Sequence, residues 1–288
     1  MTDSSPIDSV SCQTGITYCT HDGVELQGDL YLPKGPGPFP VLIAVPGGAW
    51  RVCSRASLSQ WGSYLAARGY GWFAIDYRVA TPARKAFPEA VHDVIAAVRF
   101  MRGSAEKFLI DPKRIALLGT SAGAHLAALA ALAHDQEQFG GAHPDDAFAK
   151  IAADVKTLVL VYGIYDLFKQ WQDDLALNPG VEASVTRNLL GKEPYQDPQL
   201  FFDASPFKYV TYEKSRLPVF VSWGTADEFV NPTQSESFVR VLQQARFNVR
   251  THRAVGASHF WFAQSPEDPV TDSAHLAARL LMFLKMTL

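Results

Sequence analysis

The sequence predicts an α/β protein with a mostly parallel β-sheet that is covered by helices on both faces. Short runs rich in β-branched and apolar residues alternate with longer stretches of helical spacing along most of the 288 residues, which is typical of strand–helix–strand units. In addition, the run VLIAV at residues 41–45 is apolar at every position, as expected of a strand buried on both faces. The hydrophobic fraction of 48% is sufficient for a core of this size.

The N-terminal part predicts a β-hairpin followed by the first strands of the parallel sheet. Two strand-like runs, residues 15–19 and 24–32, are separated by the turn sequence HDG. The stretch PKGPGPFP then forms a loop. Gly69 suits the C-cap of the first helix, and Pro88 suits the first turn of the second, where its missing N–H does no harm. After the loop we expect strands at residues 41–45, 71–76 and 115–119, and helices at residues 58–68, 88–102 and 122–134.

The same alternation continues in the C-terminal part, with one long interruption. Asn231 and Pro232 suit the N-cap and first residue of a helix that runs to about residue 245. Residues 163–217 are irregular and rich in aromatic residues, and a long segment of this kind usually covers a binding site. We therefore predict a single domain over residues 1–288, with residues 163–217 as a cap or lid. The other elements expected are strands at residues 158–162, 219–223 and 248–253, and a last helix at residues 272–285.

Charge, cysteine content and hydropathy argue against several classes of protein. The net charge is −3 and the 26 Lys and Arg residues are scattered, so no basic face for nucleic acid is visible. The three cysteines do not support a disulfide framework, a redox pair or a zinc site. The first ten residues have no basic segment or apolar run, and the longest apolar stretches are too short to span a bilayer. We therefore expect a cytoplasmic protein with no nucleic-acid or membrane partner.

The pattern Gly119-Thr120-Ser121-Ala122-Gly123 makes Ser121 a candidate nucleophile. Such short patterns also arise by chance, and a helix-capping serine in a glycine-rich turn is the alternative. Here the pattern follows a predicted strand and opens a predicted helix, which would raise the serine Oγ above the sheet on a sharp, strained turn. The N-terminus of that helix also brings N–H groups and a positive dipole end toward a developing oxyanion.

A nucleophilic serine needs a base, and the base needs an acid that orients it. Asp227 follows the strand run VFVSW, and His259 lies in the loop between the last strand and the last helix. Both positions are at carboxyl ends of predicted strands, where ligands bind in open α/β sheets, and the order Ser, Asp, His is known for this kind of turn. Glu228 is the alternative acid, but Asp227 is nearer to the strand end. His125, four residues after Ser121 on the same helix, is expected to be a packed histidine.

The oxyanion produced by such a serine needs backbone N–H donors. One is expected from Ala122, the residue after the nucleophile, and the others from the loop after the strand at residues 41–45. That loop has the sequence PGGAW at residues 46–50, and its glycines allow the backbone to turn N–H groups toward a substrate.

No spacing in the sequence indicates a metal or a cofactor. HExxH, paired-histidine and Cys/His patterns are absent from the sequence. His21 is expected in the hairpin turn and His92 in the middle of a helix. We therefore expect neither a metal ion nor a cofactor.

Together these residues resemble an α/β-hydrolase, and more narrowly the hormone-sensitive-lipase-like and feruloyl/carbohydrate-esterase-like carboxylesterases. The resemblance runs from about residue 20 to the end and implies an α/β-hydrolase fold with an eight-stranded central sheet and a small cap insertion. The matching stretches are PGGAW (46–50), IDYR (75–78), DPKRI (111–115), GTSAGAHLA (119–127), ASP (204–206), GTADEFV (224–230) and SHF (258–260). The site residues that the resemblance implies are Ser121 as nucleophile, Asp227 as acid, His259 as base, and Gly48, Ala49 and Ala122 as the oxyanion hole.

One position departs from the pattern of that family. The oxyanion loop of the family usually begins His-Gly-Gly, whereas this chain has Pro46 at the first place. Proline has no N–H and a fixed φ, so another contact must hold the loop. None of the expected donors is at position 46, and the departure therefore bears on substrate preference more than on activity.

Aromatic residues near the expected site predict an apolar or aromatic pocket, although each could equally belong to the core. They are Trp50, Phe168, Trp171, Trp261 and Phe262. The expected function is a serine carboxylesterase with a small or aryl ester as its small-molecule substrate. The alternatives are an arylformamidase-like amidase and a catalytically inactive ligand-binding protein on the same fold. The sequence does not decide the physiological substrate, the acyl-chain preference, or whether an edge strand or the last helix forms a homodimer.

Overall fold

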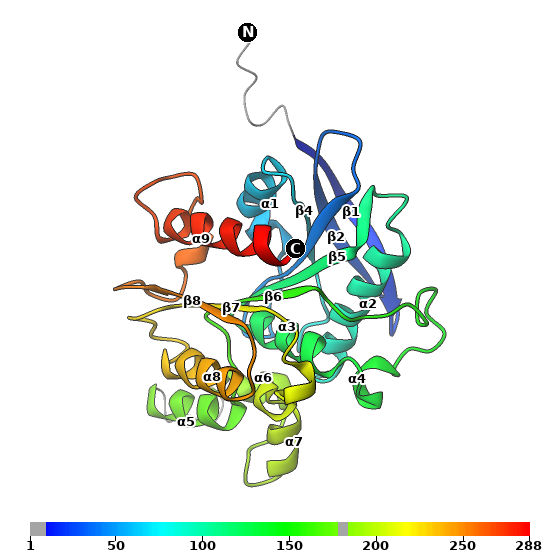
Figure 1. The fold of residues 1–288 in the computed structure, drawn as a ribbon. Helices are drawn as coiled ribbons and strands as arrows, with labels where there is room; N and C mark the ends of the chain where they lie inside the picture. The colour runs from blue at the N-terminus through cyan, green and yellow to red at the C-terminus, as the bar shows by residue number, and fades with distance from the viewer. Residues whose placement is uncertain (1–9, 178–183) are drawn as a thin grey trace.

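The computed structural model describes residues 10–177 and 184–288, and its central feature is one eight-stranded sheet (Figure 1). The strand order is β1-β2-β4-β3-β5-β6-β7-β8. β1 pairs with β2, and β2 with β4, in antiparallel fashion, whereas every later pair is parallel. The predicted mostly parallel sheet is therefore confirmed. The strands are β1 (Val10–His21), β2 (Val24–Pro33), β3 (Phe39–Val45), β4 (Gly71–Ile75), β5 (Ile110–Thr120), β6 (Thr157–Val161), β7 (Val219–Gly224) and β8 (Val249–Ala254).

β1 and β2 form the predicted hairpin, but β1 is longer than predicted. Asp22 and Gly23 have φ angles of 50° and 74°, as in the type I′ turns that suit two-residue hairpins. β1 begins at Val10, and its first residues pair with β2 while most of their side chains are exposed at the edge of the sheet. Such a polar edge has no apolar alternation to mark it as a strand. His21, which we expected in the turn, is instead the last residue of β1 and is buried.

Alternate residues of the central strands pack into two cores, one on each face of the sheet. Val41, Ile43 and Val45 of β3 belong to one core, whereas Leu42 and Ala44 belong to the other. This burial on both faces explains why the run is apolar throughout. No described helix has both the length and the apolar character needed to cross a membrane. One face is covered by α1 (Ser59–Ala66) and α9 (Asp272–Thr287), and the other by α2 (Glu89–Gly103), α3 (Ala122–Ala133) and α8 (Thr233–Gln244), with the short α4 (Glu137–Gly140) after α3 (Figure 1).

Two helices begin at residues other than those predicted, because a turn precedes each of them. α8 begins at Thr233, because Asn231 Oδ1 accepts the Thr233 N–H at 3.0 Å in a turn that precedes the helix. The helix predicted at residues 58–68 is a 3₁₀ turn, Arg55–Leu58, followed by α1. Gly69, with φ of 94°, lies three residues beyond the end of α1, and the C-cap is Ala67 rather than the predicted Gly69.

The segment between β6 and β7 is helical rather than irregular. Its start is held by Gln234 of α8, whose side-chain oxygen accepts the N–H groups of Tyr165 and Asp166, each at 3.0 Å. Further along, Gln170 Nε2 donates to the Phe229 carbonyl at 3.2 Å, so this part of the segment lies beside the loop that follows β7. The helices are α5 (Leu167–Leu177), α6 (Val185–Leu190) and α7 (Pro198–Asp203), with residues 178–183 of the predicted cap outside the described residues.

Candidate active site

Ser121 lies on a sharp turn between β5 and α3. Its φ and ψ are 52° and −122°, a strained conformation for a residue with a side chain, and its N–H donates to the Val161 carbonyl at 2.9 Å. The turn leaves no room for larger neighbours. A Cβ on Gly119 would lie 2.3 Å from the Gly123 carbonyl oxygen, and one on Gly123 would lie 2.1 Å from the Val45 carbonyl oxygen. The two glycines of the motif are therefore required by the close approach of strand and helix.

Asp227 and His259 form a continuous row of hydrogen bonds with Ser121. His259 Nδ1 is 2.7 Å from Asp227 Oδ2, and His259 Nε2 is 2.9 Å from Ser121 Oγ. The other carboxylate oxygen of Asp227 accepts the N–H groups of Phe229 and Val230 at 3.0 and 2.9 Å. Because an ionised carboxylate can only accept, the proton lies on Nδ1 and Nε2 faces the serine hydroxyl as an acceptor. This is the geometry that lets a histidine remove the serine proton.

The two rival residues are not part of this row. Glu228 has an exposed side chain, whereas Asp227 is buried and holds the histidine. His125 is fully buried, and its Nε2 donates to the Ala204 carbonyl at 2.7 Å. Burial lowers the pKa of His125 to about 4, so this ring is neutral. It is the packed histidine that the sequence predicted.

The loop after β3 presents free backbone donors next to the serine. Gly48 and Ala49 have φ angles of 127° and 51°, and neither N–H donates to an acceptor among the described residues. Ala122 is the first residue of α3, where a backbone N–H has no partner within the helix. The loop also approaches the nucleophile closely, since a Cβ on Gly47 would lie 3.0 Å from Ser121 Cβ. The loop that carries Gly48 and Ala49 therefore approaches Ser121, and Ala122 directly follows it.

Two hydrogen bonds hold the loop that begins at Pro46. Tyr77 Oη donates to the Pro46 carbonyl at 3.1 Å, and the Gly47 N–H donates to Thr120 Oγ1 at 3.0 Å. Tyr77 and the Pro46 carbonyl are both buried. Neither contact involves the side chain at position 46. In this chain, which lacks the histidine usual in the family, the loop is held by Tyr77, which follows β4, and by Thr120 of β5.

Three of the expected pocket residues belong to the core instead. Trp50 and Phe262 have no exposed surface, and Trp261 is 2% exposed. The Trp50 ring packs edge-on against His125 with centroids 5.1 Å apart, and Phe262 stacks on Trp61 at 4.3 Å. The prediction that these rings line an open pocket is corrected, because their neighbours leave no surface for a ligand.

The other two expected pocket residues lie on α5. Phe168 is 45% exposed, and its ring centroid is 5.7 Å from that of the partly buried Trp171. The Trp171 indole N–H donates to the Glu193 carboxylate, which fixes this ring within the segment between β6 and β7. Among the described residues, the rings that pair with His259 are others.

Two exposed aromatic residues that sequence analysis did not select surround His259. Phe229 is 56% and Phe260 63% exposed, and their ring centroids lie 5.7 and 5.1 Å from that of His259. The buried Tyr162 ring lies on the same histidine at 4.5 Å, and burial together with the charge of Asp227 raises the pKa of its hydroxyl. Their nearness in sequence could have identified them, since Phe229 is two residues after Asp227 and Phe260 directly follows His259.

The sequence also matches known proteins. The family model BD-FAE matches residues 28–242. The chain belongs to the BD-FAE family. Esterase LipC of Mycobacterium tuberculosis (strain ATCC 25618 / H37Rv) is 35% identical over 229 residues, which cover 77% of this chain and 53% of LipC. The probable carboxylic ester hydrolase LipM of the same organism is 32% identical over 209 residues, which cover 72% of this chain and 46% of LipM. The chain spans about half the length of these curated relatives.

A solved structure confirms the fold of this BD-FAE member. The truncated form of a carbohydrate esterase from gut microbiota superposes with a TM-score of 0.80, covering 96% of this chain and 98% of that chain at 22% identity. The sheet order and this superposition establish the α/β-hydrolase fold that the resemblance implied.

Proposed function

We propose that the chain is a serine carboxylesterase that hydrolyses a small or aryl carboxylic ester through an acyl-enzyme. The observation that carries this proposal is the hydrogen-bonded row Asp227–His259–Ser121, with contacts of 2.7 and 2.9 Å. The relatives named as an esterase and a probable carboxylic ester hydrolase support the same class of reaction.

In the first half-reaction, Ser121 Oγ attacks the carbonyl carbon of the ester while its proton passes to His259 Nε2. Asp227 keeps His259 Nδ1 protonated and stabilises the imidazolium. The carbonyl oxygen becomes an oxyanion and accepts hydrogen bonds from the backbone donors of the loop after β3 and the start of α3. The C–O bond of the ester then breaks, and the alcohol leaves with the proton from Nε2.

In the second half-reaction, water replaces the alcohol. His259 Nε2 takes one water proton while the water oxygen attacks the acyl carbon, and the same donors hold the second oxyanion. The bond from the acyl carbon to Ser121 Oγ breaks, Nε2 returns its proton to Oγ, and the carboxylic acid leaves. At the end of the cycle His259 is neutral again, Ser121 carries its proton, and Asp227 is ionised as at the start.

The α5–α7 segment is proposed as a cap beside this site. Gln170 of α5 bonds to the backbone of Phe229, and Phe229 lies against the ring of the proposed base. We therefore assign Phe229 and Phe260, rather than Trp50, to the apolar contact with the substrate. Their exposed rings offer apolar surface next to the histidine without any rearrangement.

The proposal is tested by hydrolysis of p-nitrophenyl acetate, butyrate and octanoate. Ser121→Ala should reduce kcat/KM by about 10⁴-fold or more, because the nucleophile is lost. Ser63→Ala, which removes an exposed hydroxyl from α1, should leave the rate unchanged. In parallel, a fluorophosphonate should label the wild type at Ser121, as located by peptide mass spectrometry.

Equal rates for the wild type and Ser121→Ala would overturn the assignment of the nucleophile. A wild type that is labelled but cleaves only N-formyl aryl amides would indicate the amidase instead. A correctly folded wild type that neither reacts with the fluorophosphonate nor cleaves either substrate class would indicate the inactive binding protein.

A further inference from the structure

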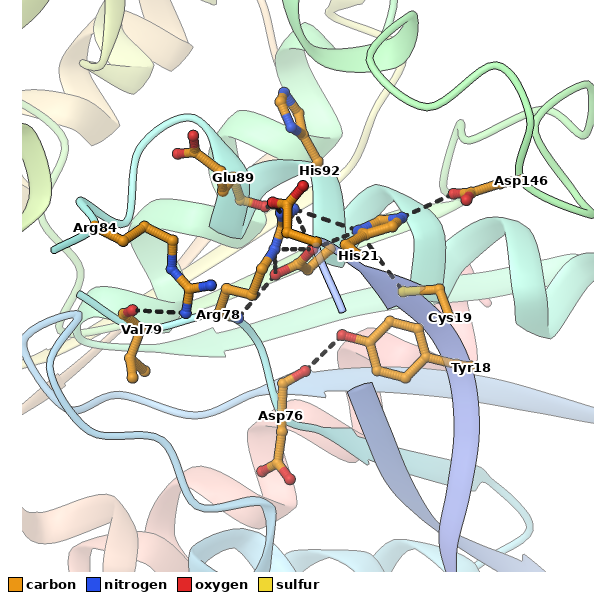
Figure 2. Close-up of polar contacts among 12 residues, drawn as sticks. Tyr18, Cys19, His21, Asp76, Arg78, Val79, Arg84, Glu89, His92 and Asp146 are labelled. Carbon is orange, nitrogen blue, oxygen red and sulfur yellow. Dashed lines mark hydrogen bonds and ion pairs between the residues drawn. The ribbon is translucent and has the colours of Figure 1, made fainter. Parts of the chain in front are cut away.

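A second polar cluster lies at the β1 end of the sheet, away from the strands that carry the triad. His21 is its centre (Figure 2). The ring is buried, with Nδ1 2.7 Å from Asp93 Oδ1 and Nε2 2.9 Å from Asp146 Oδ2. β1 is at one end of the strand order, and β7 and β8, which precede the acid and the base, are at the other. The cluster is thus separate from the proposed esterase site.

The carboxylate of Asp93 is fixed by several hydrogen bonds within the core. Asp93 of α2 has no exposed surface. It accepts the backbone N–H of Arg78 at 2.8 Å, and the Arg78 guanidinium donates to both of its oxygens at 2.7 to 3.0 Å. An ionised, fully bonded Asp93 keeps the proton of His21 on Nδ1. Nε2 faces Asp146 Oδ2 at 2.9 Å and, without a metal, donates to it, because an ionised carboxylate can only accept. A metal ion bound at Nε2 would take the place of that proton.

The second carboxylate and a further histidine come from one loop. Asp146 and His143 lie between α4 and β6, and the Asp146 side chain is 28% exposed. One ligand atom each from His21, His143 and Asp146 lies within 4.8 Å of those of the other two. Neither ring nitrogen of His143 has a hydrogen-bond partner among the described residues. Two imidazoles and one carboxylate therefore converge from segments 125 positions apart.

We propose that His21 Nε2, His143 and Asp146 bind one divalent transition-metal ion of the Zn²⁺ type. Two imidazole nitrogens and a carboxylate oxygen are ligands that zinc prefers, and water would supply the fourth position. Asp93 then has the role of the carboxylate that orients a metal-bound histidine through its other nitrogen, a frequent arrangement in zinc sites. The proposal does not depend on the esterase function.

The charges around the cluster favour a cation. Asp22, Asp93 and Asp146 contribute three negative charges, and Arg78, bonded to the first two, contributes one positive charge. Once a metal ion has replaced the Nε2 proton of His21, both histidines are neutral and two negative charges remain to balance the cation. A cavity of about 390 Å³, lined in part by Thr20 and Asp146, adjoins the cluster on the Asp146 side.

Binding requires two small movements on the loop side only. In tetrahedral zinc sites, neighbouring ligand atoms are roughly 3.3 Å apart, so Asp146 Oδ2 must move a few tenths of an ångström from its present 2.9 Å contact with His21. The His143 ring lies flat on His21, with centroids 3.7 Å apart and an angle of 6° between the planes. Because a metal binds in the plane of an imidazole, His143 must turn about its own side-chain bonds. That turn breaks the stack but no hydrogen bond among the described residues.

The test uses the 288-residue chain without a histidine tag, treated with EDTA and dialysed. Calorimetric titration with ZnCl₂ should give one site per chain with micromolar or tighter affinity, and CoCl₂ should produce the visible absorption bands of tetrahedral cobalt. His143→Ala and Asp146→Asn should each weaken binding more than about 100-fold, since changes at orienting residues alone cost 10–100-fold. His275→Ala, which removes an exposed histidine on α9, is the matched control and should bind like the wild type.

A thermal melt provides the second readout. Zn²⁺ should raise the Tm of the wild type and of His275→Ala but not that of His143→Ala or Asp146→Asn, because only binding to the folded state stabilises it. Both loop variants retain the Asp93–Arg78 pair, and circular dichroism would verify that they fold. The proposal is overturned if the wild type does not bind zinc up to millimolar concentration, or if all four proteins bind it equally. The cluster would then be an ion-pair network with a proton on His21 Nε2.

Discussion

The variant Tyr77→Phe removes one hydroxyl and tests whether the loop at residues 46–50 depends on the hydrogen bond from Tyr77 to the Pro46 carbonyl. Tyr77 Oη donates to the Pro46 carbonyl at 3.1 Å, and Tyr77 is 3% exposed. The variant leaves a buried carbonyl without this donor, at a cost of about 1–3 kcal/mol. The loop can recover part of that cost by moving toward water, and the N–H groups of Gly48 and Ala49 would move with it. If the displaced donors stabilise the transition state less by this amount of free energy, kcat/KM falls roughly 10- to 100-fold.

The assay compares kcat/KM for p-nitrophenyl acetate in the wild type, Tyr77→Phe and Tyr209→Phe. Tyr209 Oη also donates to a backbone carbonyl, that of Asp203 at 2.8 Å, and accepts from Gln138 Nε2 at 3.0 Å, but neither partner belongs to the loop at residues 46–50. Both variants should lose a similar amount of stability in urea, whereas only Tyr77→Phe should lose activity. If Tyr77→Phe is destabilised as expected and retains the wild-type kcat/KM, the loop does not depend on this hydrogen bond, and our explanation of Pro46 is wrong.

Three further outcomes are expected. Gly123→Ala, which places a methyl group 2.1 Å from a backbone oxygen of β3, should abolish activity and cost more than about 3 kcal/mol, whereas Gly69→Ala, with open space but a φ of 94°, should cost about 1 kcal/mol and retain activity. Burial lowers the pKa of His125 from 6.5 to about 4, so the folded state holds its ring neutral. The free energy of unfolding should therefore be unaffected by this residue above pH 6.5 and should fall by about 3 kcal/mol as the pH is lowered to 4. Urea titrations across that range should show a smaller fall for His125→Gln than for the wild type, and an equal dependence of unfolding free energy on pH in both proteins would contradict this. Phe229→Ala and Phe260→Ala should raise KM for p-nitrophenyl octanoate more than for the acetate, and an equal change for both esters would remove these rings from the substrate contact.

The fold and the hydrogen-bonded row Asp227–His259–Ser121 were predictable because both depend on the local course of the backbone. An apolar run such as residues 41–45 must be covered on both faces, and the structure places its alternate residues in two cores. Ser121, Asp227 and His259 each follow a strand, and parallel strands bring their carboxyl ends to one edge of the sheet. The approximate position of these residues therefore follows from the strand order, and the 2.7 and 2.9 Å contacts only refine it.

The pocket residues were not predictable in the same way, because nearness in sequence to the site does not determine which way a side chain points. Trp50 follows the oxyanion loop directly, but its backbone is left-handed, with φ of 57°, and its ring packs on His125 in the core. Phe260 is equally close to the base in sequence, and its ring remains 63% exposed. A hydrophobicity pattern assigns the same apolar character to both residues. Only the packing of the neighbouring elements separates them.

His21 shows the same limit over a longer range. Its local sequence, HDG, correctly predicts the turn that follows, but the two carboxylates that surround its ring are 72 and 125 positions away. They meet only after β1 has paired with β2 and α2 has packed against β1. A motif search depends on short spacing between ligands, as in HExxH, and cannot detect donors brought together by three separate segments. If zinc binds there, the ion links the first strand to the loop before β6, and the Tm gained on binding should be lost when either side of that link is removed.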